Sequence, residues 1–156
     1  MQDIRENISA ALKAAQKDQD KRRVATLRLA IAAITDRDIA LRGKGKDSAS
    51  DEEIAEILIT MVKQRDESSE LYRQGGRPEL EKQERDEIEI IREFLPKPLS
   101  ESEAESAIAS AIDETGAASL RDMGKVMAWL KENYRGQIDM AKAGAKIKAS
   151  LAGGQA

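Results

Sequence analysis

The amino-acid sequence predicts an all-α fold, and three observations lead to this prediction. Aromatic residues make up only 3% of the 156 residues, which is less than a β-sandwich or barrel ordinarily uses. Residues that favour helix, chiefly Ala, Leu, Glu, Lys and Arg, are abundant. Apolar residues recur three or four positions apart through most of the chain, and no segment shows the strict alternation of a strand.

The N-terminal part of the chain predicts two helices before the first long loop. Residues 2–17 form the first, with Ile4, Ile8, Leu12 and Ala15 on one face. Asp20 is placed to cap a second helix from Lys21 to about Leu41, which repeats Val24, Leu27, Ile31 and Ile34. The Gly- and Ser-containing segment 43–50 then predicts a loop.

A long antiparallel helical hairpin is expected next. Ser50 and Glu53 match a capping box, in which each side chain bonds the backbone N–H of the other residue. The helix they start ends at the Gly-Gly turn 75–76, and Pro78 suits the first turn of its successor because that turn does not use the missing N–H. Pro96 and Pro98 prevent this fourth helix from continuing. Such a short turn between long helices predicts antiparallel pairing.

Two charged residues, Arg65 and Glu84, fall within the otherwise apolar stripes of this hairpin. Antiparallel pairing about the Gly-Gly turn brings Arg65 near Glu87 or Ile88, and Ser69 near Glu84. A catalytic pair is one interpretation of this cluster. We favour a hydrogen-bonded ion network of Arg65, Glu84 and Glu87 that fixes the register of the hairpin.

The segment FLPKPLS at 94–100 predicts a domain boundary, because two prolines stiffen it. We expect an N-terminal helical domain at 1–95, a linker at 96–99 and a small three-helix bundle at 100–156. Ser100 and Glu103 form a second capping box, and the Ala-rich helix that follows stops at Gly116. Ser119 is placed to cap a helix that ends near Gly136, and Asp139 to cap the last helix.

The composition excludes several functions. The chain has no Cys and no His, which removes thiol nucleophiles, disulfides, Cys/His zinc sites and histidine bases. No apolar run approaches about 20 residues, so no membrane span is expected, and the polar N-terminus does not match a signal peptide. The Gly-Lys-Gly-Lys segment at 43–46 lacks the spacing of a phosphate-binding loop. We expect a cytoplasmic protein without cofactors or metal.

Charge is unevenly distributed along the chain. Residues 13–46 hold ten Lys/Arg against four Asp/Glu, whereas residues 47–95 hold seven against fifteen. Residues 117–156 hold seven basic residues against three acidic ones, a net charge of +4 in a protein whose total is −3. The positive field of the C-terminal segment is therefore local.

Gly124, in the stretch MGKVM, is unusual because glycine inside a helix costs about 1 kcal/mol relative to alanine. Close approach of another helix is one explanation. Close approach of a phosphate backbone, assisted by Lys125 and Arg121, is the other. The pattern alone favours helix packing.

Three longer stretches resemble a known family. They are DKRRVATLRLAIAAI at 20–34, the stretch from VKQRDESSELYRQGGRPEL to EFLPKPLSESE at 62–103, and TGAASLRDMGKVMAWLKENYRGQID at 115–139. Together they resemble the YqeY proteins, which are small relatives of the tail of amidotransferase subunit GatB. The resemblance implies an all-helical, two-part fold whose C-terminal bundle serves as a tRNA-contacting module rather than as the site of chemistry.

Three functions follow from these observations. The leading one is an accessory module that binds tRNA or associates with a tRNA enzyme, such as an aminoacyl-tRNA synthetase or an amidotransferase subunit; neither DNA nor membrane is an expected partner. The second is a carbon–nitrogen ligase with glutamine as amido donor. The third is a helical protein-interaction adaptor that binds no RNA. Because the chain has no cysteine and no visible phosphate-binding motif, we do not expect it to catalyse amide transfer alone.

The tRNA-facing surface is expected in the C-terminal domain. On a helix starting at Leu120, three basic residues project within a narrow arc opposite its apolar stripe, and two lysines of the last helix lie four apart on one face. The predicted contacts are Arg121, Gly124, Lys125, Lys131, Arg135, Gly136, Lys142 and Lys146. The competing interpretation is that these charges only keep the protein in solution. Arg22 and Arg23 are secondary candidates.

Overall fold

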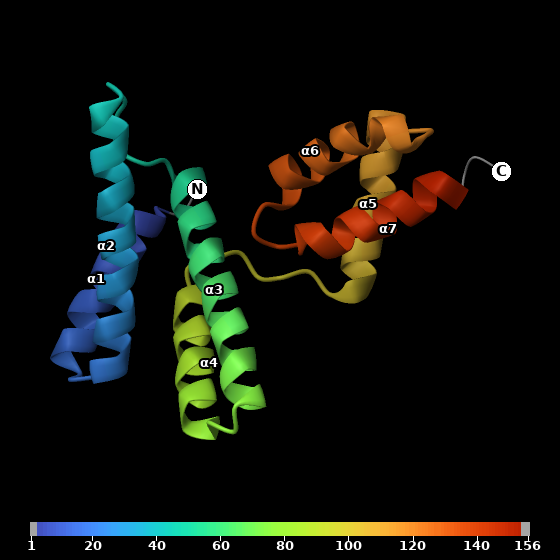
Figure 1. Ribbon diagram of the computed structural model, residues 1–156. Helices are drawn as coiled ribbons and strands as arrows, with labels where there is room; N and C mark the ends of the chain where they lie inside the picture. Colours follow the sequence, from blue (N-terminus) through green and yellow to red (C-terminus); the bar gives the residue numbers. More distant parts are fainter. Residues whose placement is uncertain (1–2, 154–156) are drawn as a thin grey trace. The chain divides into compact units, whose positions relative to one another are not determined.

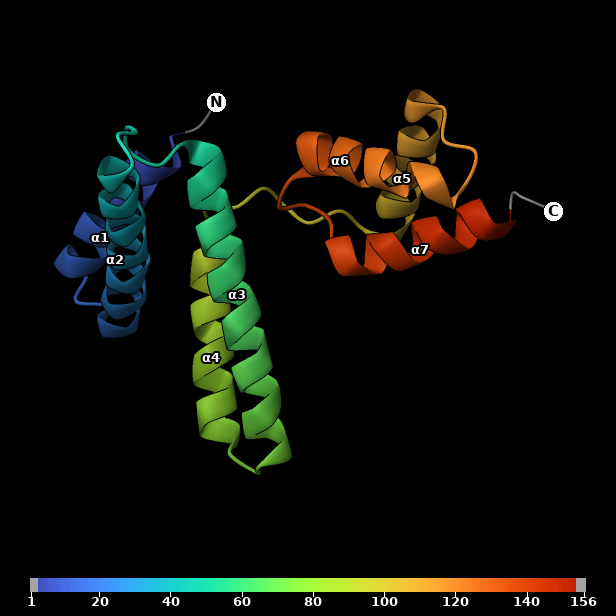
Figure 2. The same ribbon diagram turned by 45° about the horizontal axis from the view of Figure 1, so that its top comes forward.

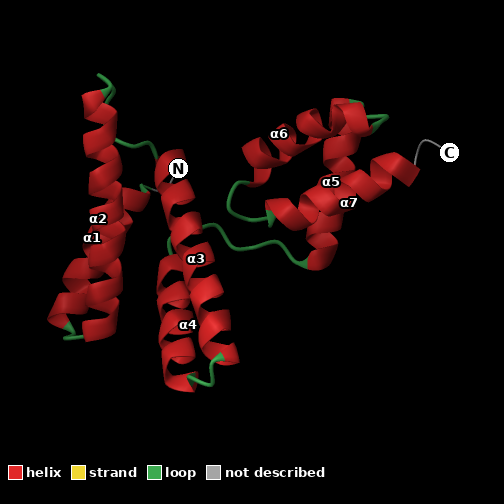
Figure 3. Cartoon of the chain, viewed as in Figure 1, coloured by secondary structure: helices red, strands yellow, loops and turns green. Residues whose placement is uncertain are grey.

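A computed structural model of the chain describes residues 3–153 (Figure 1). Within these residues the chain forms seven α-helices and one 3-10 helix, with no strand (Figure 3). The prediction of an all-α fold is confirmed. None of the described helices is long and apolar enough to cross a bilayer. The chain divides into two compact units, Met1–Pro96 (unit 1) and Lys97–Ala156 (unit 2).

Unit 1 consists of two pairs of neighbouring helices. Helix α1 lies beside α2 and α3 lies beside α4 in the views of Figures 1 and 2. Their bounds are α1 Ile4–Lys17, α2 Lys21–Gly43, α3 Asp51–Gln74 and α4 Pro78–Arg92. All four helices contribute to one core, whose fully buried side chains are Ile8, Leu27, Ile54, Leu58 and Ile91.

The ends of these helices follow local chemistry, with one departure from expectation. Asp20 accepts the N–H of Arg23 and so caps α2. Ser50 accepts the N–H of Glu53 at 3.2 Å, but the expected reciprocal bond is not formed. The carboxylate of Glu53 instead lies 3.3 Å from the hydroxyl of Ser50 and 3.6 Å from the guanidinium of Arg37. An ionic partner on α2 thus takes the place of the second capping bond.

Helix α4 ends at Arg92, three residues before the expected end. The N–H groups of Glu93, Phe94 and Leu95 each bond the carbonyl three residues earlier, at 3.1–3.3 Å, so the chain leaves α4 through a tightened turn. Pro96 disfavours helical geometry in the residue before it and has no N–H to offer.

Unit 2 contains three α-helices around a core of its own. Helix α5 lies behind α6 and α7 in the views of Figures 1 and 2. The elements are α5 Glu101–Thr115, the 3-10 helix η1 Leu120–Asp122, α6 Met123–Tyr134 and α7 Met140–Gly153. Fully buried Ala111, Val126, Leu130 and Ile147 form the centre of this core. The capping box of Ser100 and Glu103 is complete, and α5 ends at Gly116 in the left-handed region, with φ 65°.

The helix expected to begin at Leu120 begins three residues later. Ser119 caps the short η1 turn instead. The carboxylate of Asp122 accepts the N–H groups of Ala118 at 2.9 Å and Ser119 at 3.3 Å. These bonds fold the chain back on itself, and α6 follows from Met123.

Candidate nucleic-acid interface

The basic residues of unit 2 occupy three elements rather than one helical face. Arg121 lies in η1 and Arg135 follows the last residue of α6, so neither belongs to α6 itself. Only Lys125 and Lys131 are on that helix. The narrow arc predicted for Arg121, Lys125 and Arg135 is therefore wrong. Arg135 is off the helix because the chain turns after Tyr134. In this turn Gln137 donates its N–H to the carbonyl of Tyr134 at 3.0 Å.

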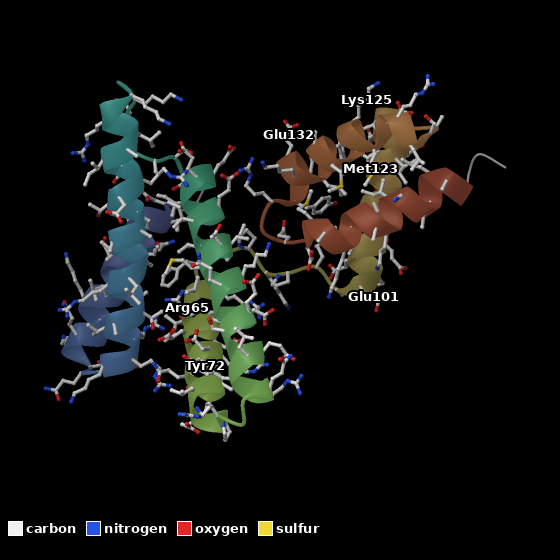
Figure 4. The ribbon with its side chains drawn as sticks, in the orientation of Figure 1. Arg65, Tyr72, Glu101, Met123, Lys125 and Glu132 are labelled. Carbon is white, nitrogen blue, oxygen red and sulfur yellow. The ribbon has the colours of Figure 1, made fainter. Side chains whose placement is uncertain are left out.

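Three of the predicted contacts are exposed cations without an acidic partner. Arg121, Lys125 and Lys142 are exposed, and in residues 3–153 none of them lies within 4 Å of a carboxylate oxygen. Figure 4 shows Lys125 projecting outward from α6. The carboxyl of Asp122 has a lowered pKa, chiefly because of the N–H groups of Ala118 and Ser119, with a smaller contribution from Lys125. These three cations are called the unpaired set below.

Lys146 differs from Lys142, although both are on α7. Its ammonium nitrogen lies 3.8 Å from Glu105 and 4.0 Å from Glu101, both on α5. The two lysines line a surface groove of about 640 Å³ whose walls are largely apolar, including Pro98, Leu99, Ala104, Ile108 and Ile138. The positive charge of Lys146 is thus partly neutralised by α5, whereas that of Lys142 is not.

Gly124 does not serve helix packing. It is exposed, and a Cβ built on it meets nothing within 4 Å, so the packing interpretation is wrong. The glycine at a helix contact is Gly144 of α7, whose Cβ would lie 3.6 Å from the terminal methyl groups of Met123 and Met127. Gly136 has φ 77°, a conformation that favours glycine, at the turn after α6.

The loop after α6 is tied to the segment that enters unit 2. Leu99 donates its N–H to the carbonyl of Gln137 at 2.8 Å, and the side-chain amide of Gln137 donates to the carbonyl of Lys97 at 3.2 Å. The N-terminus of α7 is capped as expected, since Asp139 accepts the N–H groups of Ala141 and Lys142 at 2.9 and 3.1 Å. The connection between α6 and α7 is therefore held to the segment before α5.

The basic residues of α2 are in a different electrostatic environment. Arg22 donates a hydrogen bond to Asp86 at 2.8 Å, and Arg23 donates two hydrogen bonds to Glu93. Asp86 is on α4, and Glu93 directly follows its last residue. The hydrogen bonds that Arg23 donates to Glu93 raise the pKa of Arg23. Acidic residues of the segment 47–95 thus pair with three of the ten basic residues of the segment 13–46, namely Arg22, Arg23 and Arg37.

Arg65 and Glu87 meet across the α3–α4 pair. The guanidinium Nε of Arg65 lies 3.0 Å from Glu87 Oε2, and both side chains are about 85% buried, with 13% and 15% exposed. Arg65 also donates to the carbonyl of Met61 at 3.3 Å; Figure 4 labels it beside the α3–α4 pair. Among the described residues no hydrogen bond joins Glu84 to Arg65. Burial raises the pKa of Glu84, and the neighbouring charge of Glu87 raises it further.

One buried ionic site was not predicted. The carboxylate of Asp38 on α2 accepts three hydrogen bonds. Two come from the terminal guanidinium nitrogens of Arg5, at 2.9 and 3.0 Å, and one comes from the N–H of Ala49, at 2.7 Å. The bonds from Arg5, and then that from Ala49, lower the pKa of Asp38 to about 2. Asp38 stands four residues after Ile34, where the apolar stripe of α2 would continue. A charged residue at a core-facing position was the feature of the sequence that could have revealed this site.

The described residues contain no group of three acidic side chains placed to hold a metal ion. Known proteins similar to this chain supply a separate line of information. The family described as "Yqey-like protein" matches residues 5–151. The chain belongs to the YqeY-like family.

A relative of this YqeY-like chain is the protein named "Altered inheritance of mitochondria protein 41, mitochondrial" from Lachancea thermotolerans (strain ATCC 56472 / CBS 6340 / NRRL Y-8284). The two are 29% identical over 145 residues, which is 88% of this chain and 76% of the relative. The family match runs through both units of the YqeY-like chain. Family membership therefore applies to the two units together.

Proposed function

We propose that this YqeY-like protein is an accessory module that binds tRNA through the basic residues of unit 2. The observation that carries the proposal is the unpaired set, Arg121, Lys125 and Lys142, which is exposed and lacks acidic partners within 4 Å in the described residues. Unpaired cations attract phosphates and release the counterions of the nucleic acid. The arginines at the start of α2 are already paired with carboxylates.

In this proposal the two units have different roles. The α3–α4 pair is an antiparallel hairpin within an N-terminal domain, and α5–α7 form a three-helix bundle that carries the RNA-facing surface. Exposed Gly124, next to Lys125, leaves room for a phosphate to approach the backbone at the start of α6. Lys131, Arg135 and Gly136 are at the other end of that helix, and Lys146 is the weakest candidate because it faces Glu101 and Glu105.

Anisotropy of fluorescently labelled tRNA, measured between 50 and 300 mM salt, tests the proposal. The triple variant Arg121→Ala/Lys125→Ala/Lys142→Ala is expected to bind more weakly. Its log–log salt slope is expected to flatten by up to about 0.9 for each duplex phosphate that the variant no longer neutralises. The matched control Lys44→Ala/Lys46→Ala/Lys63→Ala removes three exposed lysines from unit 1. Equal effects of the two triple variants would contradict the assignment.

The proposal assigns no catalytic residue to the chain. Amide transfer needs release of ammonia, activation of a carboxylate by ATP, and attack on the activated acyl group. An assay of the purified protein with misacylated tRNA, ATP and glutamine is expected to show no amidation. Amidation that depends on both ATP and glutamine would show that the protein is an enzyme in its own right.

A further inference from the structure

Helix α2 has two apolar faces, of which only one is used inside unit 1. The face that contains Leu27, Ala30 and Ile34 is buried in the core. On the opposite side Leu29 and Ile39 are 51% and 58% exposed, and Ala25 and Ala32 on the same side are exposed as well. Figures 1 and 2 show α1 behind α2. Exposed apolar side chains aligned between residues 25 and 39 of one helix make this face a candidate interaction surface.

The pattern of this outer face is regular. Ala25, Ala32 and Ile39 are seven residues apart, the spacing that keeps side chains on one line along a helix that packs against another. Arg28 and Asp36 stand four residues before and four residues after Ala32, so they lie on the same face at equal distances from it. Both are exposed, and neither forms an ion pair among residues 3–153.

We propose that this face binds a second copy of the chain, with the two α2 helices antiparallel about a twofold axis through Ala32. Antiparallel pairing about that residue places Arg28 of each copy opposite Asp36 of the other, so one interface gives two ion pairs. It also places the small Ala25 opposite the large Ile39. Because Cα atoms lie about 2.3 Å from the helix axis, two alanines that face each other at the twofold axis fit an interaxial distance of about 10 Å, within the usual range.

The charge pattern selects a second copy over an unrelated partner. In a twofold interface the same patch is used by both molecules, so the patch must be complementary to itself. One positive and one negative side chain at equal distances from a central small residue meet this requirement. The like-charged pair that the arrangement also creates, Arg22 opposite Arg42, lies at the edge of the face, and Arg22 is already held by Asp86 at 2.8 Å.

Sedimentation velocity of the full chain over a range of concentrations tests the dimer. The wild-type protein is expected to show a reversible monomer–dimer equilibrium. Either Arg28→Asp or Asp36→Arg makes positions 28 and 36 carry the same charge, so like charges face each other at both places where the two copies should form an ion pair. Each variant is expected to weaken self-association at least about tenfold. An equimolar mixture of the two variants restores both ion pairs, so a mixed dimer is expected to form. The matched control Lys63→Asp, on an exposed site of α3, is expected to dimerise normally.

Cross-linking gives a second readout, because the chain has no cysteine. The variant Ala32→Cys places two thiols at the axis, within the Cβ separation of about 4 Å that a disulfide requires. It is expected to oxidise to a covalent dimer at least tenfold faster than Ala128→Cys, an exposed position on α6. Two results would overturn the proposal. One is a chain that remains monomeric at hundreds of micromolar, and the other is a mixture in which the two charge variants do not restore the dimer.

Discussion

Replacement of Asp38 with asparagine is expected to destabilise unit 1 and to remove part of its acid sensitivity. The Asp38 side chain is 8% exposed and accepts three hydrogen bonds, two from Arg5 and one from the N–H of Ala49. These bonds join α1, α2 and the loop before α3. An amide of the same shape can still accept from Ala49, but it cannot form the charged two-pronged pair with Arg5.

The structure sets the size of the effect. A pKa lowered from 3.8 to about 2 corresponds to about 2.4 kcal/mol in favour of the folded, ionised form. The Arg5 side chain is 39% exposed, and solvent screening reduces this to about 1–2 kcal/mol. Because the folded-state pKa is the lower one, this stabilisation is present above pH 4 and is lost as the pH falls from about 4 to about 2.

Urea unfolding followed by circular dichroism at pH 7 and at steps down to pH 2 measures both effects. Asp38→Asn is expected to lose about 1–2 kcal/mol at pH 7, equivalent to about 4–16 °C in melting temperature for a unit of this size. The difference from wild type is expected to shrink toward pH 2. Asp66→Asn, an exposed control on α3, is expected to stay within about 0.5 kcal/mol of wild type. A loss that is unchanged between pH 7 and pH 2 would refute the ionic explanation.

Three further predictions follow from the two cores and their helix contacts. Residues 97–156 expressed alone are expected to give a helical circular-dichroism spectrum and a cooperative melt, because unit 2 has its own buried cluster; a disordered fragment would show that unit 1 is required. Arg65→Ala is expected to cost about 3 kcal/mol, since it leaves Glu87 buried without its partner, and an unchanged melting temperature would contradict this. Gly124→Ala is expected to stabilise the protein by up to about 1 kcal/mol, because its Cβ enters open space; a lower melting temperature would argue against this placement.

Local signals in the sequence were sufficient for most of the helices. Asp20, Ser100 and Pro78 stand at helix starts where their chemistry requires them, and the glycines at 75–76 end α3. Such signals depend on a few neighbouring residues, so a sequence alone can reveal them. The start of α6 was expected three residues too early, because the capping box of Ser119 and Asp122 opens the 3-10 turn η1 and α6 follows it from Met123.

Contacts between distant segments limited the prediction of the sites. The meeting of Arg65 and Glu87 followed from the register of one short turn. The pairing of Arg22 and Arg23 with α4 and its end, 64 and 70 residues away, depends on how the two helix pairs pack. The packing of α1 against α2 brings Arg5 to Asp38. Charge counted along the chain therefore overstated the basic character of α2 and did not separate Lys142 from Lys146.

The central claim is that tRNA contacts unit 2 and not the basic stretch of α2. Photochemical cross-linking of the full chain to tRNA, with the attached peptides identified by mass spectrometry, tests it most directly. Cross-links are expected within residues 117–153, around Arg121, Lys125 and Lys142, and are expected to disappear as salt is raised. Cross-links confined to residues 13–46, or no cross-link above that of an albumin control, would contradict it.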